Sequence, residues 1–304
     1  MDINIEELIK LLPEGYKEAS FETKAIERQR IIKTPEELIV MCLYYIYGAT
    51  LIETSQLAGM NWTGQMSDVA FMKRFIKCNG WFQWITENIK PDAVTGYQLP
   101  EILKPYHVVA IDASDVYTKG AIKQAWHLHY SVDLFSLNCS QFKITEESTG
   151  ETLKNFTIQE KDLIIADRAV ATSLPETFTA EEILNLYRLR WQVEMVFKRY
   201  KSILGLGSIP TKTKESTEAW LNGKMLVALL VEKFLSDVDF PPMGKMKKNR
   251  SIWRETKLVF LLIFILIMPK NNLPFGQDFL RLSIGSFVEK RKKDRLQMVT
   301  FSLS

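Results

Sequence analysis

The chain has 304 residues, 46% of them hydrophobic and 25% charged, a composition that argues against a disordered or fibrous protein. Its formal net charge is only +3, so any affinity for DNA has to come from local basic patches. Three widely spaced cysteines predict free thiols in a reducing cytoplasm. The acidic N-terminus and the lack of an apolar run long enough to span a bilayer predict no signal peptide and no membrane segment.

Residues 4–90 have the pattern of a helical domain. Thr34 followed by Pro-Glu-Glu predicts the start of a helix, because Thr caps the first turn and Pro is tolerated there. Two shorter helices are expected at 51–58, where a glycine follows, and at 68–77. Short helices joined by glycine-containing turns are compatible with a helix-turn-helix.

The third of these helices has a basic edge. Lys73, Arg74 and Lys77 fall near one side of it and could meet DNA phosphates. A plain helical bundle with a solvated basic edge explains the same pattern, and the residues alone do not separate the two interpretations.

A region of alternating strands follows a predicted linker at 90–100, which contains two prolines and a glycine. Three strands are predicted, the last two antiparallel, and a short helical piece comes after them at 151–156. The strands span residues 106–117, 125–134 and 139–147. His127 and His129 face the same side of the second strand, but without a third matching ligand nearby they are predicted to be structural.

Two aspartates end apolar runs that read as buried strands. Asp112 follows residues 107–111, and Asp167 follows residues 163–166. A β-branched run that closes on a carboxylate is expected where a strand delivers a ligand to the carboxyl end of a sheet. Either aspartate alone is more often a turn or cap residue. Asp115 is predicted to begin a turn rather than to bind a ligand.

Four polar residues recur in the run TAEEILNLYRLRWQVEMVFKRYKSILGLG, at spacings of three, four and seven. In a single α-helix, Tyr187, Arg190, Glu194 and Lys201 fall within an arc of about 60° beside an apolar stripe. Accidental spacing explains any one pair of them. Glu194 together with the two aspartates makes three hard oxygen ligands, which suit a pair of Mg²⁺ or Mn²⁺ ions in phosphoryl transfer.

The end of the chain is predicted to be helical again. The main helices are expected at 222–235 and 252–268, with a Pro-Pro-Met-Gly break at 241–244. Two late basic clusters, at 245–250 and 290–295, either neutralise DNA phosphates or are simply solvated.

These motifs together resemble a known family. The string YRLRWQVEMVFKRYK (Tyr-x2-Arg-x3-Glu-x6-Lys) looks like the signature of bacterial insertion-sequence transposases, which have an Asp-Asp-Glu active site on a ribonuclease-H-like core. The stretches VVAIDASDV, AWHLHYSVDL, IIADRA and TSLPETFTAEEILNLY resemble the same family. The likeness covers roughly residues 25–230 and is strongest over 181–205.

The resemblance implies an α/β fold, with a ribonuclease-H-like mixed sheet and flanking helices at 105–212. A helical N-terminal domain, 1–95, would bind transposon-end DNA, and a helical C-terminal region, 213–304, would form a homodimer. The partners would be double-stranded DNA at the terminal inverted repeats and at the target. Three residues would bind the two metal ions, and four would hold the phosphates. The metal ligands are Asp112, Asp167 and Glu194, and the phosphate ligands are Tyr187, Arg190, Lys201 and Arg168.

The sequence departs from the family pattern in one place. Only 26 residues separate Asp167 from Glu194, where relatives usually carry a β-rich insertion. The predicted strands at 163–166 and 170–172 cannot be neighbouring parallel strands, because these need a crossover of about a dozen residues. We therefore hypothesise that a segment has been lost near 169–170, so that Glu194 need not reach the two aspartates.

Three functions follow from these patterns. The first is cut-and-paste transposition of an insertion sequence by metal-dependent hydrolysis of the 3′ end and strand transfer. The second is a catalytically silent remnant that still binds transposon-end DNA. The third is a metal nuclease of the ribonuclease-H group, which would not need a helical DNA-binding domain.

Overall fold

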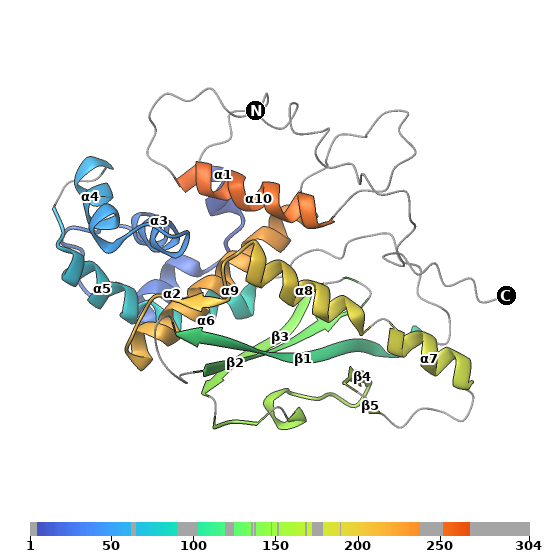
Figure 1. Cartoon of the computed structure of the whole chain (residues 1–304). Helices are drawn as coiled ribbons and strands as arrows, with labels where there is room; N and C mark the ends of the chain where they lie inside the picture. The colour runs from blue at the N-terminus through green and yellow to red at the C-terminus, as the bar shows by residue number, and fades with distance from the viewer. Residues whose placement is uncertain are drawn as a thin grey trace. The chain divides into compact units, whose positions relative to one another are not determined.

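The computed structural model describes most of the chain, which divides into two compact units (Figure 1). The helical unit comprises residues 1–91 and 209–289, and the α/β unit comprises residues 92–208 and 290–304. The described residues are 5–61, 65–89, 103–118, 125–134, 136, 138–146, 148–150, 152–167, 169–171, 179–188, 190–237 and 252–267. The predicted linker at 90–100, the break at 241–244 and both late basic clusters lie outside them.

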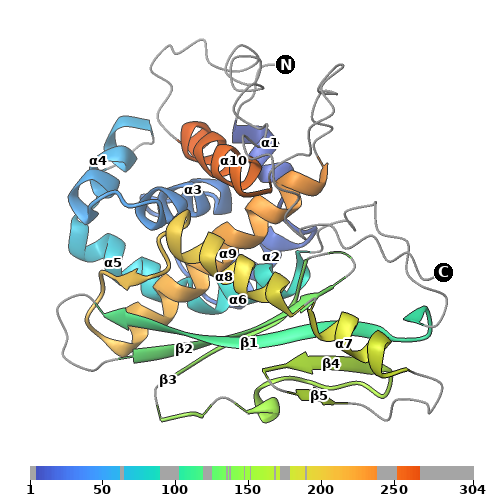
Figure 2. The same ribbon diagram turned by 45° about the vertical axis from the view of Figure 1, so that its right-hand side comes forward.

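The helical unit is built from amphipathic helices packed around a shared apolar core (Figures 1 and 2). In chain order they are α1 (Ile5–Lys10), α2 (Tyr16–Glu22), α3 (Pro35–Ile46), α4 (Leu51–Asn61), α5 (Asp68–Lys77), α6 (Asn79–Asn88), α9 (Lys214–Asp237) and α10 (Ile252–Ile267). No helix in the described ranges is both long and apolar enough to cross a membrane.

Local sequence signals set the ends of several of these helices. Thr34 and Glu37 form a capping box at the start of α3, as predicted, and the side chain of Ser67 accepts a hydrogen bond from the backbone N–H of Ala70 at the start of α5. The predicted end of α4 was wrong, because the helix continues through Gly59; a glycine inside a helix costs only about 1 kcal/mol. Similarly, α9 begins well before the predicted 222, because Thr213 caps its first turn.

A glycine allows α9 to lie very close to its neighbours. A Cβ atom on Gly223 would stand 2.5 Å from Cδ1 of Ile46 and 3.4 Å from Cε2 of Phe82. Two of the cysteines, Cys42 and Cys78, are free thiols buried in the same core. The close approach therefore depends on the absence of a side chain at position 223.

The α/β unit contains a mixed sheet, as predicted. Within the described residues its strand order is β3-β2-β1-β4-β5, and the short β6 pairs with β1. The β1–β2 and β2–β3 pairs are antiparallel, and β1 and β4 are parallel (Figures 1 and 2). The strands are β1 (His107–Thr118), β2 (Ala125–Asp133), β3 (Cys139–Glu146), β4 (Asp162–Ala166), β5 (Ala169–Ala171) and β6 (Ser208–Ile209).

The arrangement confirms the α/β fold class and is consistent with a ribonuclease-H-like sheet. The first three strands lie within a residue of their predicted bounds, and the predicted helical piece is the single turn η2 (Leu153–Asn155). The strands β4 and β5 pair antiparallel, with Ala166 opposite Ala169, so they form a hairpin rather than two parallel neighbours. The two-residue connection between them consists of Asp167 and Arg168, of which Arg168 lies outside the described residues.

The prediction of one continuous helix through Tyr187 and Lys201 was wrong. The chain forms two helices, α7 (Ala180–Arg188) and α8 (Trp191–Ser202). The backbone N–H of Arg190 donates to the carbonyl of Tyr187, and that of Val193 donates to the carbonyl of Arg190. Both bonds span three residues instead of four, which tightens the chain into a turn between the helices.

A buried pair of tyrosines fixes α8 on one face of the sheet. The hydroxyls of Tyr130 on β2 and Tyr200 on α8 are 2.7 Å apart, and their rings meet edge to face. Phe197 of α8 packs on the same Tyr130 ring. The other face of the sheet carries a separate cluster, formed by Val109, Ile111, Ile164, Phe156 and Ala166.

Candidate active site

The two aspartates lie at matching positions on the parallel pair of strands. His107 pairs with Asp162, and the register continues to Ala110 opposite Ile165. Extended by two residues, this register places Asp112 of β1 opposite Asp167, the first residue after β4. Because parallel strands present their carboxyl ends at the same edge, both carboxylates belong to one end of this pair.

The register also places α8 on the same face as Asp112. Asp112 is directly opposite Tyr130 in the antiparallel β1–β2 pair, and directly opposed residues point to the same face. Tyr130 contacts Phe197 and Tyr200 of α8. Glu194 lies one helical turn before Phe197, so the packing of α8 brings its carboxylate toward the end of the strands that carries the aspartates.

Arg190 joins the acids into one cluster. Its Nη2 lies 2.6 Å from Oε1 of Glu194 and 3.8 Å from Oδ1 of Asp167. Burial alone would lower the pKa of Arg190, but electrostatic interactions with Glu194, Tyr187, Asp167 and Asp112, in that order, outweigh burial and raise it above its ordinary value. All three predicted metal ligands therefore act on one guanidinium, and we call these four residues the arginine–carboxylate cluster.

The cluster opens to solvent on one side. The Arg190 side chain is 19% exposed, that of Glu194 is 34% exposed and that of Asp167 is 64% exposed. The ring of Tyr187, at the end of α7, lies with its centroid 5.9 Å from Cζ of Arg190. Lys201 is exposed on α8, about two turns after Glu194.

Three carboxylates have the right chemistry for a hard divalent cation. Among the residues that the structure describes, however, no three acidic, histidine or cysteine side chains are arranged so that they could hold a metal ion as they stand. The guanidinium of Arg190 binds Glu194 and lies 3.8 Å from an oxygen of Asp167. The donor types therefore suit a divalent cation, but the three carboxylates do not form a site for one in their present positions.

Comparison with known proteins finds similarity to transposases over part of the chain. Residues 134–230 match the transposase DDE domain family. The chain is 44% identical over 82 residues to InsL of insertion sequence element IS186A and to the transposase for insertion sequence element IS421, both from Escherichia coli. Each match covers 26% of this chain and 22% of the relative. This part of the chain is thus similar to the DDE domain of bacterial insertion-sequence transposases.

A second group of insertion-sequence transposases matches a longer stretch. The transposase for insertion sequence element IS231F of Bacillus thuringiensis subsp. israelensis is 30% identical over 134 residues, which is 43% of this chain and 28% of the relative. The chain thus spans about a quarter of the length of these relatives. No solved structure matches it significantly.

The family match covers only part of the arginine–carboxylate cluster. The matched residues 134–230 include Asp167, Arg190 and Glu194, whereas Asp112 lies before them. Asp112 enters the cluster through the sheet register and through its charge on Arg190. The sheet register is therefore the geometric reason for grouping Asp112 with the other two acids.

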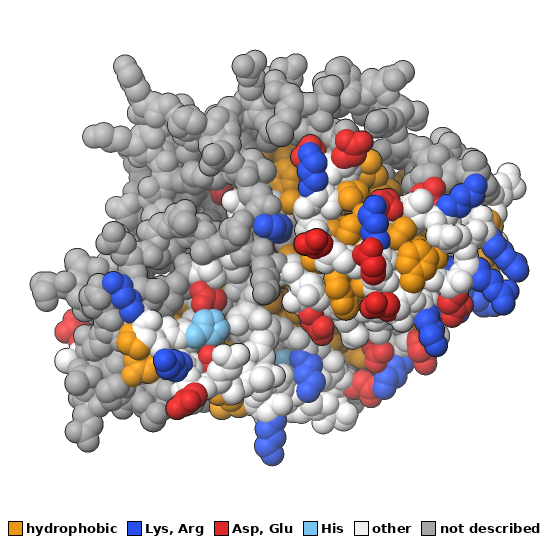
Figure 3. Space-filling model, turned by 180° about the vertical axis from the view of Figure 1, so that it is seen from behind, with side chains coloured by type: hydrophobic (Ala, Val, Ile, Leu, Met, Phe, Trp, Pro, Cys, Tyr) orange, Lys and Arg blue, Asp and Glu red, His pale blue; other side chains and the backbone are white. Residues whose placement is uncertain are grey.

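The predicted basic edge on α5 is partly engaged within the helical unit. The guanidinium of Arg74 donates to the carbonyl of Ala25 at 2.8 Å, and Lys77 forms an ion pair of 2.6 Å with Glu27. Lys73 is exposed. On the face shown in Figure 3, Lys and Arg side chains are interspersed with Asp and Glu. The described part of this face therefore has no extended area of positive charge.

The two histidines of β2 have protein partners, as predicted for structural residues. Nδ1 of His127 lies 2.8 Å from Oδ1 of Asp115, and Nε2 of His129 lies 2.8 Å from Oγ1 of Thr145. Burial lowers the pKa of His129, which favours its neutral form. The prediction that Asp115 begins a turn was wrong, because β1 continues past it and pairs it with His127.

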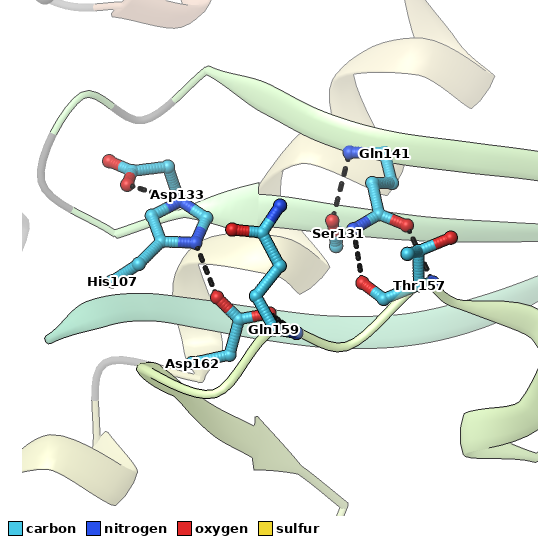
Figure 4. A network of polar contacts seen from close by, with 7 residues as sticks. All are labelled: His107, Ser131, Asp133, Gln141, Thr157, Gln159 and Asp162. Atoms are coloured by element: carbon cyan, nitrogen blue, oxygen red, sulfur yellow. Dashed lines mark hydrogen bonds and ion pairs between the residues drawn. The ribbon is translucent and has the colours of Figure 1, made fainter.

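A third histidine forms a network that the sequence did not indicate. Nδ1 of His107 lies 2.9 Å from Oδ1 of Asp162, and its Nε2 lies 3.1 Å from Oδ2 of Asp133 (Figure 4). This histidine clamp joins the starts of β1 and β4 to the end of β2. It lies five residues before each aspartate of the cluster, so it fixes the register that brings them level.

Proposed function

We propose that the chain is a DDE transposase that performs cut-and-paste transposition through Asp112, Asp167 and Glu194. These residues would hold two Mg²⁺ or Mn²⁺ ions, which supply polarisation of the scissile phosphate and activation of the attacking water or 3′-hydroxyl. The observation that carries the proposal is the placement of Arg190 against Glu194 and Asp167, within reach of the charge of Asp112.

The protein groups around the acids would position the DNA strand. Arg190 presents a planar fork that can bind phosphate oxygens in pairs, and Tyr187 packs beside it. Lys201 is exposed on α8 and would contact a phosphate further along the strand, and Arg168, outside the described residues, would contact another. These residues would hold the scissile bond in line between attacking and leaving oxygens.

The remaining parts of the chain would bind DNA and a second protomer. Residues 1–95 would grip the terminal inverted repeat, with Lys73 on a phosphate; a contact by Arg74 would compete with its bond to Ala25. Residues 105–212 would form the catalytic core. Residues 213–304 would form the dimer, because joining two transposon ends requires two active sites. The partners are thus double-stranded DNA at the repeats and the target.

A cleavage assay tests this function. The purified protein is incubated with a duplex carrying its own flanking inverted repeat while Mg²⁺ or Mn²⁺ is titrated. We expect 3′-end nicking that depends on the metal and that Glu194→Gln reduces at least about 100-fold. Glu181→Gln, an acid-to-amide change at an exposed site on α7, is the matched control and should cleave normally. Equal cleavage by both variants would argue against a role for Glu194.

A silent DNA-binding remnant is a second candidate, favoured by the tight β4–β5 hairpin. Only Asp167 and Arg168 connect these strands, and we propose that a segment present in relatives is missing near 169–170. Retarded migration of the inverted repeat without any metal-dependent nicking would support the remnant. Cleavage of an RNA–DNA hybrid that survives deletion of residues 1–95 would instead point to a ribonuclease-H-type nuclease.

A further inference from the structure

We propose that Arg190 acts as an internal counter-ion that keeps metal out of the acidic site until a DNA phosphate draws its guanidinium away. The inference rests on the proposed function, because it concerns the same three acids. It assigns Arg190 two alternative partners, the carboxylates in the DNA-free protein and a phosphate in the complex. Metal loading and DNA binding would then be coupled through one side chain.

The contacts of Arg190 show why it stabilises the DNA-free site. Asp112, Asp167 and Glu194 bring three negative charges to one end of the sheet, and like charges at short range repel. The guanidinium lies 2.6 Å from Glu194 and 3.8 Å from Asp167, and Asp112 acts on it electrostatically. A single cation therefore offsets part of the repulsion among all three acids.

The same contacts oppose metal binding. An oxygen of Glu194 already accepts a charge-assisted hydrogen bond from Arg190, so it is not available as an undisturbed metal ligand. A divalent ion bound among the acids would also stand close to the guanidinium, and the two positive charges would repel each other. Both effects act against a metal ion at these acids, and the described residues contain no group of three such side chains placed to hold one.

The position of Arg190 in the chain allows the exchange. It is the N-cap residue of α8, in the turn after α7, and its side chain makes no capping hydrogen bond that a change of rotamer would break. The Arg190 side chain is itself 19% exposed, so part of it can be reached from solvent. Phosphate matches the guanidinium fork at least as well as a carboxylate does.

Thermodynamic linkage makes the proposal measurable. If bound DNA moves Arg190 away from the acids, DNA raises the affinity of the protein for the metal ion. By linkage, the metal ion then raises the affinity of the protein for DNA by the same factor. Such couplings are typically about 5- to 150-fold. This coupling factor should fall toward one when residue 190 carries no charge.

The experiment measures binding of Mn²⁺ alone to the full-length, DNA-free protein, with the free ion followed by electron paramagnetic resonance. We expect Arg190→Gln to bind Mn²⁺ at least about tenfold more tightly than wild type, because a nearby positive charge is removed. Lys198→Gln is the matched control, since Lys198 is an exposed cation on α8 whose amine lies over the Trp191 ring. It should change the affinity less than about twofold. Adding Glu194→Gln to Arg190→Gln should abolish the gain.

Unchanged or weaker Mn²⁺ binding by Arg190→Gln would overturn the proposal. If the wild type nevertheless cleaves its inverted repeat with Mn²⁺, the proposed function stands and only the counter-ion role fails. If the wild type binds no Mn²⁺ even with the repeat present and does not cleave, both fail. Should Arg190→Gln be too unstable to titrate, its Tm decides: a larger rise with Mn²⁺ than in wild type supports the proposal, and an equal rise contradicts it.

Discussion

The histidine clamp predicts a pH-dependent contribution to the stability of the α/β unit. Replacing His107 by Gln removes the positive charge that lies between Asp133 and Asp162. It keeps an amide donor that can reach one of the two carboxylates. We therefore expect the variant to fold, but to lose the electrostatic part of the clamp at neutral and acidic pH.

The size of the effect follows from the pKa of His107. The hydrogen bond to Asp133, helped by that to Asp162, outweighs burial and raises this pKa to about 9 from 6.5. Because the folded-state pKa is the higher one, the stabilisation is complete below about pH 6.5 and is lost as the pH rises through about 9. A fully shielded group would contribute roughly 3 kcal/mol, but the side chain is 44% exposed. Allowing for solvent screening, we expect roughly 1 kcal/mol.

Urea unfolding followed by far-ultraviolet circular dichroism measures this contribution. His107→Gln should be destabilised by roughly 1 kcal/mol at pH 6 and by much less at pH 9.5. His129→Gln is the matched control on β2: burial lowers the pKa of His129, so its effect should not shrink between pH 7 and 9.5. A destabilisation by His107→Gln that is the same at both pH values would refute the charged clamp.

Three further predictions concern packing, each read from thermal or urea unfolding. Gly223→Ala should destabilise the helical unit by about 1–3 kcal/mol, because the added methyl group would clash with Ile46. Gly80→Ala is the control, because a methyl group there would make only ordinary contacts and should not destabilise the unit. Equal effects of the two substitutions would contradict the close approach at Gly223. Removing the Tyr130 hydroxyl with Tyr130→Phe should cost about 1 kcal/mol, and the cost should vanish in a background that already lacks the Tyr200 hydroxyl. Burial lowers the pKa of Lys224 to about 8, so the protein should gain stability as the pH rises from about 8 toward 10.5, and Lys224→Met should abolish that gain. A Lys224→Met variant with the wild-type pH profile would show that another group is responsible.

Local sequence patterns predicted many of the helices and strands. Alternating apolar residues located the first three strands to within a residue, and the Thr34 capping box located a helix start. Such signals are local, since side-chain period and capping depend on residues a few positions apart. The short spacing after Asp167 likewise excluded a parallel β4–β5 pair, and the structure has an antiparallel hairpin there.

The features that the sequence did not reveal depend on register or on single hydrogen bonds. The helical wheel placed Tyr187 and Glu194 on one helix, but two bonds spanning three residues at Arg190 divide it. The clamp between His107 and Asp162 depends on the pairing of strands more than fifty residues apart, which no local pattern encodes. The two aspartates were found because they follow apolar runs, although β1 continues past Asp112, whereas the contact of Arg190 with Glu194 and Asp167 was not foreseen.

The most direct test of a shared metal site is to exchange one ligand for a softer atom. Asp167→Cys replaces a carboxylate with a thiolate, which Mg²⁺ tolerates poorly and Mn²⁺ tolerates better. We expect this variant to lose cleavage of the inverted repeat in Mg²⁺ and to regain it in Mn²⁺, while the control Asp115→Cys cleaves with both ions. Cleavage by Asp167→Cys at the wild-type rate in Mg²⁺, or no recovery in Mn²⁺ by a folded protein that still binds the repeat, would contradict a shared metal site.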